Sequence, residues 1–311
     1  MAEPTNRPPN RIEYGVERHC PCCAAPKLTP FLETAYVSCK LCGALVSTAD
    51  AAGYEADYYY HLPGAERRER LRAAVEWRWY RRLARVALVS ATSARQPTAI
   101  DFGCSKGFFV EAGLAHGLAI RGYDVSDVAL ASARARGLGA SCTKRDMLVD
   151  DQASPIDAAD FVFAWEVIEH FDDIAAFLAA VRRVLHPGGW LLGSTPNGQS
   201  SWISVLGSTW HGFAIPQYHR IYFNPTALTI ALARHGFSDV TAITCVDWRS
   251  SQLIRNTATE LTKKFLGTND IRIRTLVALA ASPLHKIAEI ASGRVNGLSG
   301  DTLLFAARLH P

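Results

Sequence analysis

Apolar residues from residue 98 onward fall into short runs that alternate with stretches of helical periodicity. Runs of about four to eight apolar residues, bounded by turn residues, are typical of buried strands, whereas spacings of three and four residues favour helices. We expect strands at 98–102, 119–123, 141–145, 159–165, 190–194, 238–246 and 302–307, and helices at 107–116, 126–136, 174–185 and 225–235. Ser126 is expected to cap the second helix, and Gly137 to end it.

This alternation predicts an α/β fold, a doubly wound, mostly parallel seven-stranded sheet with helices on both faces. Ligands of such sheets bind beyond the carboxyl ends of the strands. Residues 198–223 and 250–298 interrupt the pattern, and we interpret them as insertions in a domain at 98–311. The second insertion reads as two helices, and no chemistry can be assigned to it.

The part of the chain before residue 98 has a different character. Residues 1–16 are polar and rich in proline, which predicts a disordered arm, and residues 17–50 hold a cysteine cluster. Residues 51–97 are expected to form a linker and a helical cap with eight arginines between Arg67 and Arg85. These arginines are either solvated on one face of an amphipathic helix or form a basic lid over an acidic substrate.

Composition excludes several classes of protein. The 311 residues are 49% hydrophobic and 20% charged, which is ordinary for a globular protein and excludes a collagen-like or disordered chain. The net charge of +4 falls short of a dedicated nucleic-acid binder. The polar N-terminus does not resemble a signal peptide, and no apolar run reaches the roughly 18 residues that span a bilayer. We therefore expect a cytoplasmic protein without a membrane span.

Five of the eight cysteines fall within 23 consecutive residues. Cys20, Cys23, Cys39 and Cys42 have the spacing C-x2-C-x15-C-x2-C, which predicts a zinc ribbon with four thiolate ligands. Cys22 is interpreted as a bystander. Four protein ligands leave no position for a substrate, so we expect the zinc to be structural and to supply folding energy to a module with little core.

A glycine-rich turn follows the first strand of the α/β domain, in the sequence Asp101-Phe-Gly-Cys-Ser-Lys-Gly107. The glycines allow the backbone to approach a ligand, and the lysine and serine of a Walker loop are absent. Acidic residues end the next strands: Asp124 can accept both hydroxyls of a ribose, Asp146 an adenine amino group, and Glu166 follows the fourth strand. The ordered set suits a ligand with a ribose, an adenine and a positive centre.

The motifs DFGCSKG, GYDVS, RDM, AWEVIEH and LHPGGWLLGSTPN resemble those of class I S-adenosylmethionine-dependent methyltransferases, and the resemblance covers residues 80–309. It implies a Rossmann-like fold and S-adenosylmethionine as cofactor, with a serine at position 105 where the family usually has glycine. The resemblance assigns the methionine moiety to Asp101, Gly103, Ser105 and Gly107, the ribose to Asp124, and the adenine to Asp146 and Met147. It places Trp165 and Glu166 near the methyl-bearing sulfur, and Cys104 and Val125 are also expected to bind the cofactor.

Residues after the fourth strand bear on the acceptor. No Asp/Asn-Pro-Pro-Tyr/Phe motif and no Pro-Cys nucleophile stands there, which argues against methylation of amino groups of adenine or glutamine and of cytosine carbon. The pair Glu169-His170 resembles that of small-molecule O-methyltransferases, such as those of quinone biosynthesis, and of sugar C-methyltransferases. We expect His170 to be the general base and Glu169 to orient it or to bind a sugar hydroxyl. The alternative is that both residues only cap the turn into the next helix.

A second cluster of aromatic and basic residues lies in the first insertion. As substrate contacts we expect Trp210, His211, Tyr218, His219, Arg220 and Tyr222. Aromatic rings can stack on a sugar or aryl ring, and Arg220 can hold a phosphate or carboxylate. The alternative is that these aromatics form the core of a loop. The segment resembles zinc-ribbon methyltransferases of cell-surface glycan and secondary-metabolite pathways.

The leading hypothesis is therefore methyl transfer to a hydroxyl of a small molecule or glycan in a biosynthetic pathway. An RNA methyltransferase, in which the ribbon and the arginine-rich helix hold the phosphate backbone, is the alternative among enzymes. The modest charge argues against nucleic acid as partner. A non-catalytic cofactor-binding protein is a third interpretation. The acceptor and the oligomeric state stay open.

Overall fold

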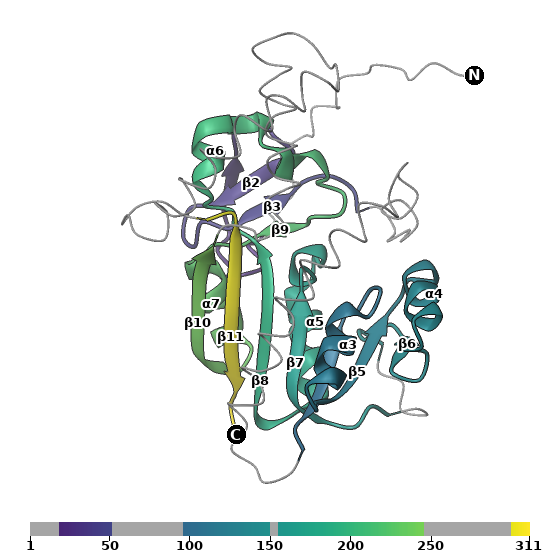
Figure 1. Ribbon diagram of the computed structural model, residues 1–311. Coiled ribbons are helices and arrows are strands. Elements are labelled where there is room, and N and C mark those ends of the chain that lie inside the picture. The colour runs from purple at the N-terminus through teal and green to yellow at the C-terminus, as the bar shows by residue number, and fades with distance from the viewer. Residues whose placement is uncertain (1–18, 52–95, 150–154, 246–299) are drawn as a thin grey trace, which may run out of the picture.

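The computed structural model describes residues 19–51, 96–149, 155–245 and 300–311, which contain two β-sheets (Figure 1). One buried hydrophobic cluster includes residues of both sheets. Three predicted features, the N-terminal arm, the arginine-rich helical cap and the two helices of the second insertion, lie outside the described residues.

The larger sheet has seven strands in the order β10-β11-β8-β7-β4-β5-β6. They are β4 (Thr98–Phe102), β5 (Ala119–Asp124), β6 (Cys142–Lys144), β7 (Ala159–Trp165), β8 (Leu185–Pro196), β10 (Phe237–Cys245) and β11 (Thr302–Leu309). Pairs from β6 to β8 are parallel, and β11 runs antiparallel between β8 and β10. The predicted fold, a doubly wound and mostly parallel seven-stranded sheet, is confirmed.

Helices cover the sheet because its central strands are apolar on both faces. In β7, Val162, Phe163 and Ala164 are fully buried although their side chains alternate between the two faces. The covering helices are α3 (Phe108–Ala115), α4 (Asp127–Ala135), α5 (Ile174–Arg183) and α7 (Pro225–Arg234).

The predicted start and end of α4 are confirmed. The Ser126 hydroxyl accepts a hydrogen bond from the backbone N–H of Ala129 at 3.1 Å, which satisfies one of the N–H groups that a helix leaves unpaired at its start. Gly137, just beyond the helix, has a φ of 82°, a conformation that glycine adopts without strain.

The prediction was wrong about the boundary between α5 and β8. The helix ends at Arg183, and residues 185–189 belong to the strand instead of a separate loop. Leu185 pairs with Ala159, and the next pairs join Trp190 to Phe161, so β8 carries extra residues opposite one residue of β7. Gly188, with a φ of 77°, allows this irregular stretch to turn without leaving the sheet.

The smaller sheet has the order β1-β2-β3-β9. β1 (Leu28–Pro30), β2 (Tyr36–Cys39) and β3 (Leu45–Ser47) come from the cysteine-rich segment. β9 (Ile221–Tyr222) comes from the first insertion, and it pairs with β3 through Leu45 and Tyr222 and through Val46 and Ile221. The insertion thus contributes a strand to the sheet that contains the cysteines.

The rest of the first insertion packs onto the same sheet. It contains α6 (Ser201–Leu206) and the short helices η2 (Gly207–Thr209) and η3 (His211–Ala214). Tyr36 and Leu45 of the ribbon share a buried cluster with Trp210 and Phe213 of the insertion. Burial of such a side chain contributes about 1.5–3 kcal/mol, so packing against the insertion helps to stabilise the ribbon.

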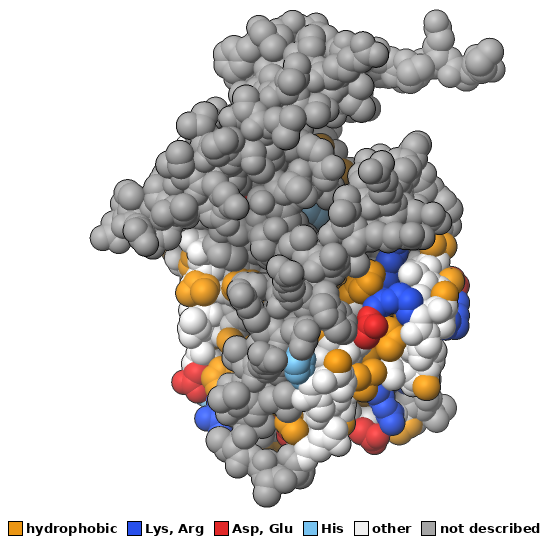
Figure 2. Space-filling view, in the orientation of Figure 1, with side chains coloured by type: hydrophobic (Ala, Val, Ile, Leu, Met, Phe, Trp, Pro, Cys, Tyr) orange, Lys and Arg blue, Asp and Glu red, His pale blue; other side chains and the backbone are white. Residues whose placement is uncertain are grey.

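The visible surface carries charges of both signs. Figure 2 shows basic and acidic side chains interspersed with apolar ones over the side of the molecule that contains α3 and α4. Among the described residues, the helices are too short or too polar to pass through a bilayer.

Candidate functional site

The glycine-rich turn between β4 and α3 depends on its two glycines. Gly103 has a φ of 75°, and a Cβ atom there would lie 2.7 Å from a methyl carbon of Val167. Gly107 has a φ of 74°, and its Cβ would lie 2.9 Å from the sulfur of Cys142. Ser105, at the position where the family usually has glycine, also has a positive φ of 49°, which costs about 1 kcal/mol in a residue with a side chain.

Asp101 provides the first test of whether a cofactor fits this turn. Its side chain is buried, and among the described residues its Oδ1 atom has no hydrogen-bond partner. Burial raises the pKa of Asp101 well above its usual range, and the Cys142 thiol and Asp124 add to the effect. A cationic donor beside this oxygen would satisfy the acceptor and stabilise the carboxylate. The ammonium group of a methionine moiety has that chemistry.

Asp124 lies directly beside the turn. One carboxylate oxygen accepts a hydrogen bond from the Ser105 backbone N–H, and the other from the Ser126 N–H, both at 2.8 Å. Burial raises the pKa of Asp124, and these backbone bonds act against the increase. Backbone N–H groups thus fix the carboxylate beside the turn, with lone-pair capacity left to accept a hydroxyl group of a ligand.

The other predicted cofactor residues end the neighbouring strands at the same edge of the sheet. After β6, Asp146 is exposed and accepts from the Leu148 N–H at 2.9 Å, whereas Met147 is buried. After β7, Glu166 has a φ of 55° and accepts from the Ser194 hydroxyl at 2.7 Å. Cys104 and half-buried Trp165 belong to the core beside the turn, and Val125 is exposed. Their roles toward a cofactor stay predictions.

Glu169 and His170 form the short helix η1 (Ile168–His170). Nδ1 of His170 lies 2.9 Å from the carbonyl oxygen of Tyr218. Because a carbonyl only accepts, Nδ1 carries the proton, and Nε2 is the unprotonated nitrogen of the neutral ring. Burial lowers the pKa of His170 below its ordinary value of 6.5, while the Tyr218 carbonyl and Glu166 act against this. A lowered pKa favours the neutral ring, which is the form that a general base requires.

Glu169 is completely buried beside this histidine. One carboxylate oxygen accepts from the Thr195 hydroxyl at 3.1 Å, and the other lies 4.0 Å from Nε2 of His170. The ring of His219 lies 5.0 Å from that of His170. Nδ1 of His219 lies 2.9 Å from the Tyr222 hydroxyl, whose own proton goes to the Gly212 carbonyl. His219 is thus the donor at Nδ1 in this hydrogen bond.

In the structure Trp210 and Tyr222 pack in a buried aromatic cluster, and their predicted contact with a substrate stays a prediction. Both are buried, and their rings lie 5.3 Å apart in a cluster with Tyr36 and Phe213. This arrangement is the loop core that the sequence left as the alternative. The side chain of His211 lies outside the described part of the structure.

Arg220 is also buried, and it is paired within the protein. Its Nε donates to Asp172 at 2.9 Å, and one terminal nitrogen donates to the Ser47 hydroxyl at 3.1 Å and the Pro216 carbonyl at 2.8 Å. A guanidinium held in this way serves as a structural connection rather than as a free anion ligand. These contacts give Arg220 a structural role, and its role toward a phosphate or carboxylate stays a prediction. Tyr218, half buried, contributes its carbonyl.

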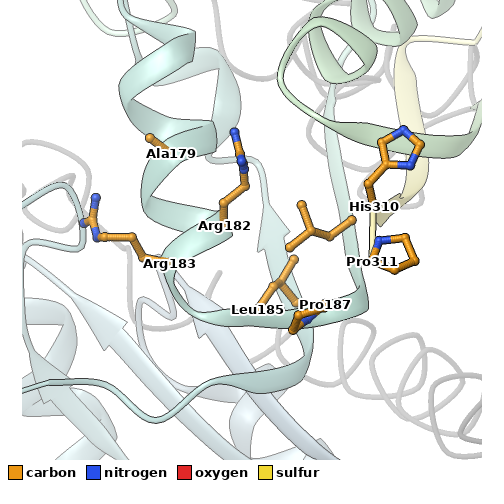
Figure 3. A pocket seen from close by; sticks show the side chains of 8 residues that line it. Ala179, Arg182, Arg183, Leu185, Pro187, His310 and Pro311 are labelled. Carbon is orange, nitrogen blue, oxygen red and sulfur yellow. The ribbon is translucent and has the colours of Figure 1, made fainter.

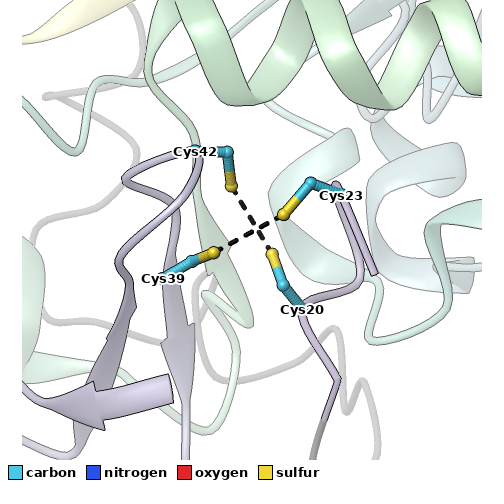
Figure 4. A group of neighbouring side chains, drawn as sticks. All are labelled: Cys20, Cys23, Cys39 and Cys42. Atoms are coloured by element: carbon cyan, nitrogen blue, oxygen red, sulfur yellow. Dashed lines mark hydrogen bonds between the residues drawn. The ribbon is translucent and has the colours of Figure 1, made fainter. Parts of the chain in front are cut away.

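The four predicted zinc ligands converge from two turns (Figure 4). The sulfurs of Cys20 and Cys42, and those of Cys23 and Cys39, lie 3.5 Å apart, and all four lie within 4.8 Å of one another. A tetrahedral zinc with Zn–S bonds of about 2.3 Å separates its sulfurs by about 3.8 Å, so the set fits the metal. Cys22 is buried, and its thiol contacts those of Cys20 and Cys42 without belonging to the group of four. Its interpretation as a bystander stays a prediction.

The two turns have the same backbone. In the first, the Cys20 N–H donates to Ala25 and its carbonyl accepts from Ala24; in the second, Cys39 does the same with Ala44 and Gly43, all at 2.8–2.9 Å. Ala24 and Gly43 occupy equivalent positions and have φ angles of 59° and 76°. This repetition directs both thiols of each turn to one side.

Helix α7 attaches these turns to the larger domain. At its start, the Asn224 side chain accepts from Ala227 and donates to the Cys42 carbonyl, both at 2.9 Å. At its end, Arg234 donates to the Cys22 carbonyl at 3.0 Å. Asn-Pro at 224–225 is a recognisable helix start, but its contact with the ribbon has no local signal in the sequence.

A surface hollow lies at the opposite edge of the large sheet (Figure 3). It is found where β8 begins and β11 ends, and its lining includes Arg182, Arg183, Leu185 and His310. Ligands of parallel sheets bind at the carboxyl edge, so this hollow is separate from the candidate site.

Comparison with solved structures supports the fold. A Haemonchus contortus phosphoethanolamine N-methyltransferase 2, solved in complex with S-adenosyl-L-methionine, matches with a TM-score of 0.51 and 16% sequence identity, over 86% of this chain and 62% of that chain. At this identity the likeness concerns the fold alone.

Curated relatives match the central part of the chain. A ubiquinone biosynthesis O-methyltransferase of Rhodopseudomonas palustris (strain BisB18) is 30% identical over 122 residues, 37% of this chain and 42% of the relative. That of Paramagnetospirillum magneticum is 35% identical over 102 residues, 32% of this chain and 41% of the relative. The chain thus matches less than half the length of these relatives.

The family comparison covers more of the chain. The model of the family described as a methyltransferase domain matches residues 67–242, which is more than half of the 311 residues. Together with the seven-stranded sheet, this match establishes the family. The chain belongs to the methyltransferase domain family, with the fold of the class I S-adenosylmethionine-dependent enzymes.

Proposed function

We propose that this protein transfers the methyl group of S-adenosylmethionine to a hydroxyl oxygen of a small molecule, with His170 as the general base. The observation that carries the proposal is the hydrogen bond from His170 Nδ1 to the Tyr218 carbonyl, which leaves Nε2 unprotonated at the carboxyl edge of the sheet. The relatives named as O-methyltransferases support the same chemistry.

The protein itself has three tasks in this reaction. Asp101, Asp124 and the glycine-rich turn would bind and orient the cofactor, which supplies an activated methyl group on a sulfonium. His170 would accept the acceptor's hydroxyl proton at Nε2 as the new oxygen–methyl bond forms and the sulfur–methyl bond breaks. The proton then passes to water. Alignment of the two reactants provides much of the rate in such a transfer.

Glu169 would support the histidine. Its buried oxygen, 4.0 Å from Nε2, stabilises the imidazolium that forms when the proton arrives. The Thr195 hydroxyl holds the other oxygen and so fixes the carboxylate. Within the proposal, Glu169 is a positioning and electrostatic partner of His170.

We also propose that Cys20, Cys23, Cys39 and Cys42 bind one structural zinc ion. The spacing of the four sulfurs and the matching backbone of the two turns support this assignment. Four thiolates complete the coordination shell, so the ion would hold the ribbon together without taking part in catalysis.

Two measurements on the purified full chain test the methyl transfer. Calorimetric titration with S-adenosylhomocysteine is expected to give micromolar binding. Incubation with S-adenosylmethionine and probes that include phenol, catechol, 3,4-dihydroxybenzoate and hexoses is expected to add 14 mass units to a hydroxyl compound. Methylation of RNA alone, tested in parallel, would instead support the RNA interpretation.

The variant His170→Gln isolates the base. Glutamine keeps a polar side chain but cannot take the proton, so turnover is expected to fall by about 10²–10⁴ while the affinity for S-adenosylhomocysteine stays within about twofold. Turnover within about twofold of the wild type would exclude His170 as the base.

A further inference from the structure

A segment of the first insertion lies in space between the ribbon and the helix η1, and it contacts both. We call residues 216–222 the strap. One side of the strap contacts the ribbon, and the other contacts η1, where Glu169 and His170 are found. Nothing in the sequence pattern of the ribbon indicates this contact.

On the ribbon side, Ser47 and Tyr36 hold the strap. The Ser47 backbone N–H donates to the Arg220 carbonyl at 2.8 Å, and its hydroxyl donates to the Pro216 carbonyl at 2.7 Å. The same hydroxyl accepts from Arg220 at 3.1 Å and from the Ala49 N–H at 3.2 Å. One donor and two acceptors exhaust what a hydroxyl can offer, so Ser47 is fully engaged.

Tyr36 makes the second connection. Its hydroxyl donates to the His219 carbonyl at 3.0 Å, and its ring lies 5.2 Å from that of Tyr222. Tyr222 in turn accepts from the His219 ring. Tyr36 therefore contacts the backbone of His219 and the residue that fixes its tautomer.

On the other side, the strap contacts η1 at two places and Asp172, just beyond η1, at a third. The Arg220 backbone N–H donates to the Glu169 carbonyl at 2.7 Å, and its side chain donates to Asp172 at 2.9 Å. The Tyr218 carbonyl accepts from His170. The position of the strap thus determines where the Tyr218 carbonyl lies, and this carbonyl determines which nitrogen of His170 is unprotonated.

We propose that Ser47 and Tyr36 are positioning residues of the candidate acceptor site, which act through the strap on His170 and His219. The ribbon then helps to position residues of the candidate site, in addition to its structural role. This inference rests on the proposed function for its kinetic consequence, but its structural consequence, the fixed tautomer of His170, can be measured without a substrate.

The variants Ser47→Ala and Tyr36→Phe, in the full zinc-loaded chain, test the inference. Each removes one hydroxyl and keeps the buried side-chain volume or ring. The matched control is Thr48→Ala, because the hydroxyl of the adjacent Thr48 donates at 3.1 Å to Ala35 within the ribbon and not to the strap. Zinc content and S-adenosylhomocysteine affinity, expected to stay within about twofold, show whether each variant has folded.

Long-range ¹H–¹⁵N NMR spectra report the tautomer of each histidine. We expect the Nδ1–H signature of His170 in the wild type and in the control, and a mixed signature in Ser47→Ala and Tyr36→Phe. With 3,4-dihydroxybenzoate as probe acceptor, kcat is expected to fall at least about fivefold in these two variants, because a buried hydrogen bond is lost. The KM for S-adenosylmethionine is expected to be unchanged.

The outcomes separate the two proposals. An unchanged His170 tautomer in both test variants, or the same change in Thr48→Ala, overturns the positioning role. A changed tautomer without methyl transfer by the wild type to any probe leaves the positioning role standing and removes the proposed function. If Ser47→Ala does not fold, Tyr36→Phe, whose ring still packs, gives the result.

Discussion

Replacement of Gly103 by alanine tests the geometry of the glycine-rich turn. The residue has a φ of 75°, which costs a residue with a side chain about 1–2 kcal/mol. The new Cβ would also lie 2.7 Å from a methyl carbon of Val167, and relief of such an overlap in a packed core costs about 1–3 kcal/mol. We therefore expect Gly103→Ala to lower the free energy of unfolding by about 2–5 kcal/mol.

The variant Gly137→Ala is the matched control. Gly137 has a similar φ of 82°, but a Cβ atom added there would have nothing within 4 Å. It should therefore lose only the backbone contribution of about 1–2 kcal/mol. Urea denaturation of the full chain, followed by circular dichroism, measures both losses on one scale.

A third variant identifies the source of the difference. In Gly103→Ala combined with Val167→Ala, the overlap is removed while the backbone strain stays. The double variant should then be less destabilised than the sum of the two single variants, since neighbouring residues couple. Equal losses for Gly103→Ala and Gly137→Ala, or strict additivity with Val167→Ala, would refute the contact between the turn and Val167.

Three further outcomes are expected. Asp124→Ala should weaken S-adenosylhomocysteine binding more than about tenfold in calorimetry, and unchanged affinity would contradict the ribose assignment. Burial lowers the pKa of His170 below 6.5, so kcat/KM with the probe acceptor should be constant from pH 8 to 7 and fall only below pH 6.5. A decline of kcat/KM that begins above pH 7 would contradict the role of His170 as a neutral buried base. Cys39→Ser should reduce zinc, measured by atomic emission, from one ion per chain to well below one, whereas Cys22→Ser should keep it, and equal loss in both would refute the ligand set.

The strands of the large sheet and the acidic residues at their ends could be predicted from the sequence, because each depends on a short stretch of the chain. An apolar run such as that of β7 identifies a buried strand wherever it pairs, and an acidic residue at a strand end lies at the ligand edge of any parallel sheet. The boundary between α5 and β8 was missed for the opposite reason. Whether Leu185 continues a helix or begins a strand depends on Ala159, a partner from another part of the chain.

The types of residue in the first insertion were not enough to predict whether its aromatic side chains contact a substrate or form a core. Aromatics and an arginine after a strand fit a substrate loop and a loop core equally well, because both bury the same groups. Packing placed Trp210 and Tyr222 in the core and paired Arg220 with Asp172 and Ser47. Among the described residues, the His219 ring lies beside that of His170, and its role toward a substrate stays a prediction.

Local patterns along the chain were enough to predict the fold class, the ordered acidic residues at the strand ends, and the two cysteine pairs, because each depends on neighbours within about one turn or strand. The folded arrangement was needed to see that β9 joins the ribbon sheet, and that Ser47 contacts Arg220, 173 positions later. A two-residue strand and a single serine carry no periodic signal. Their positions are set by the need to pair a sheet edge and to satisfy a buried guanidinium once the chain is compact.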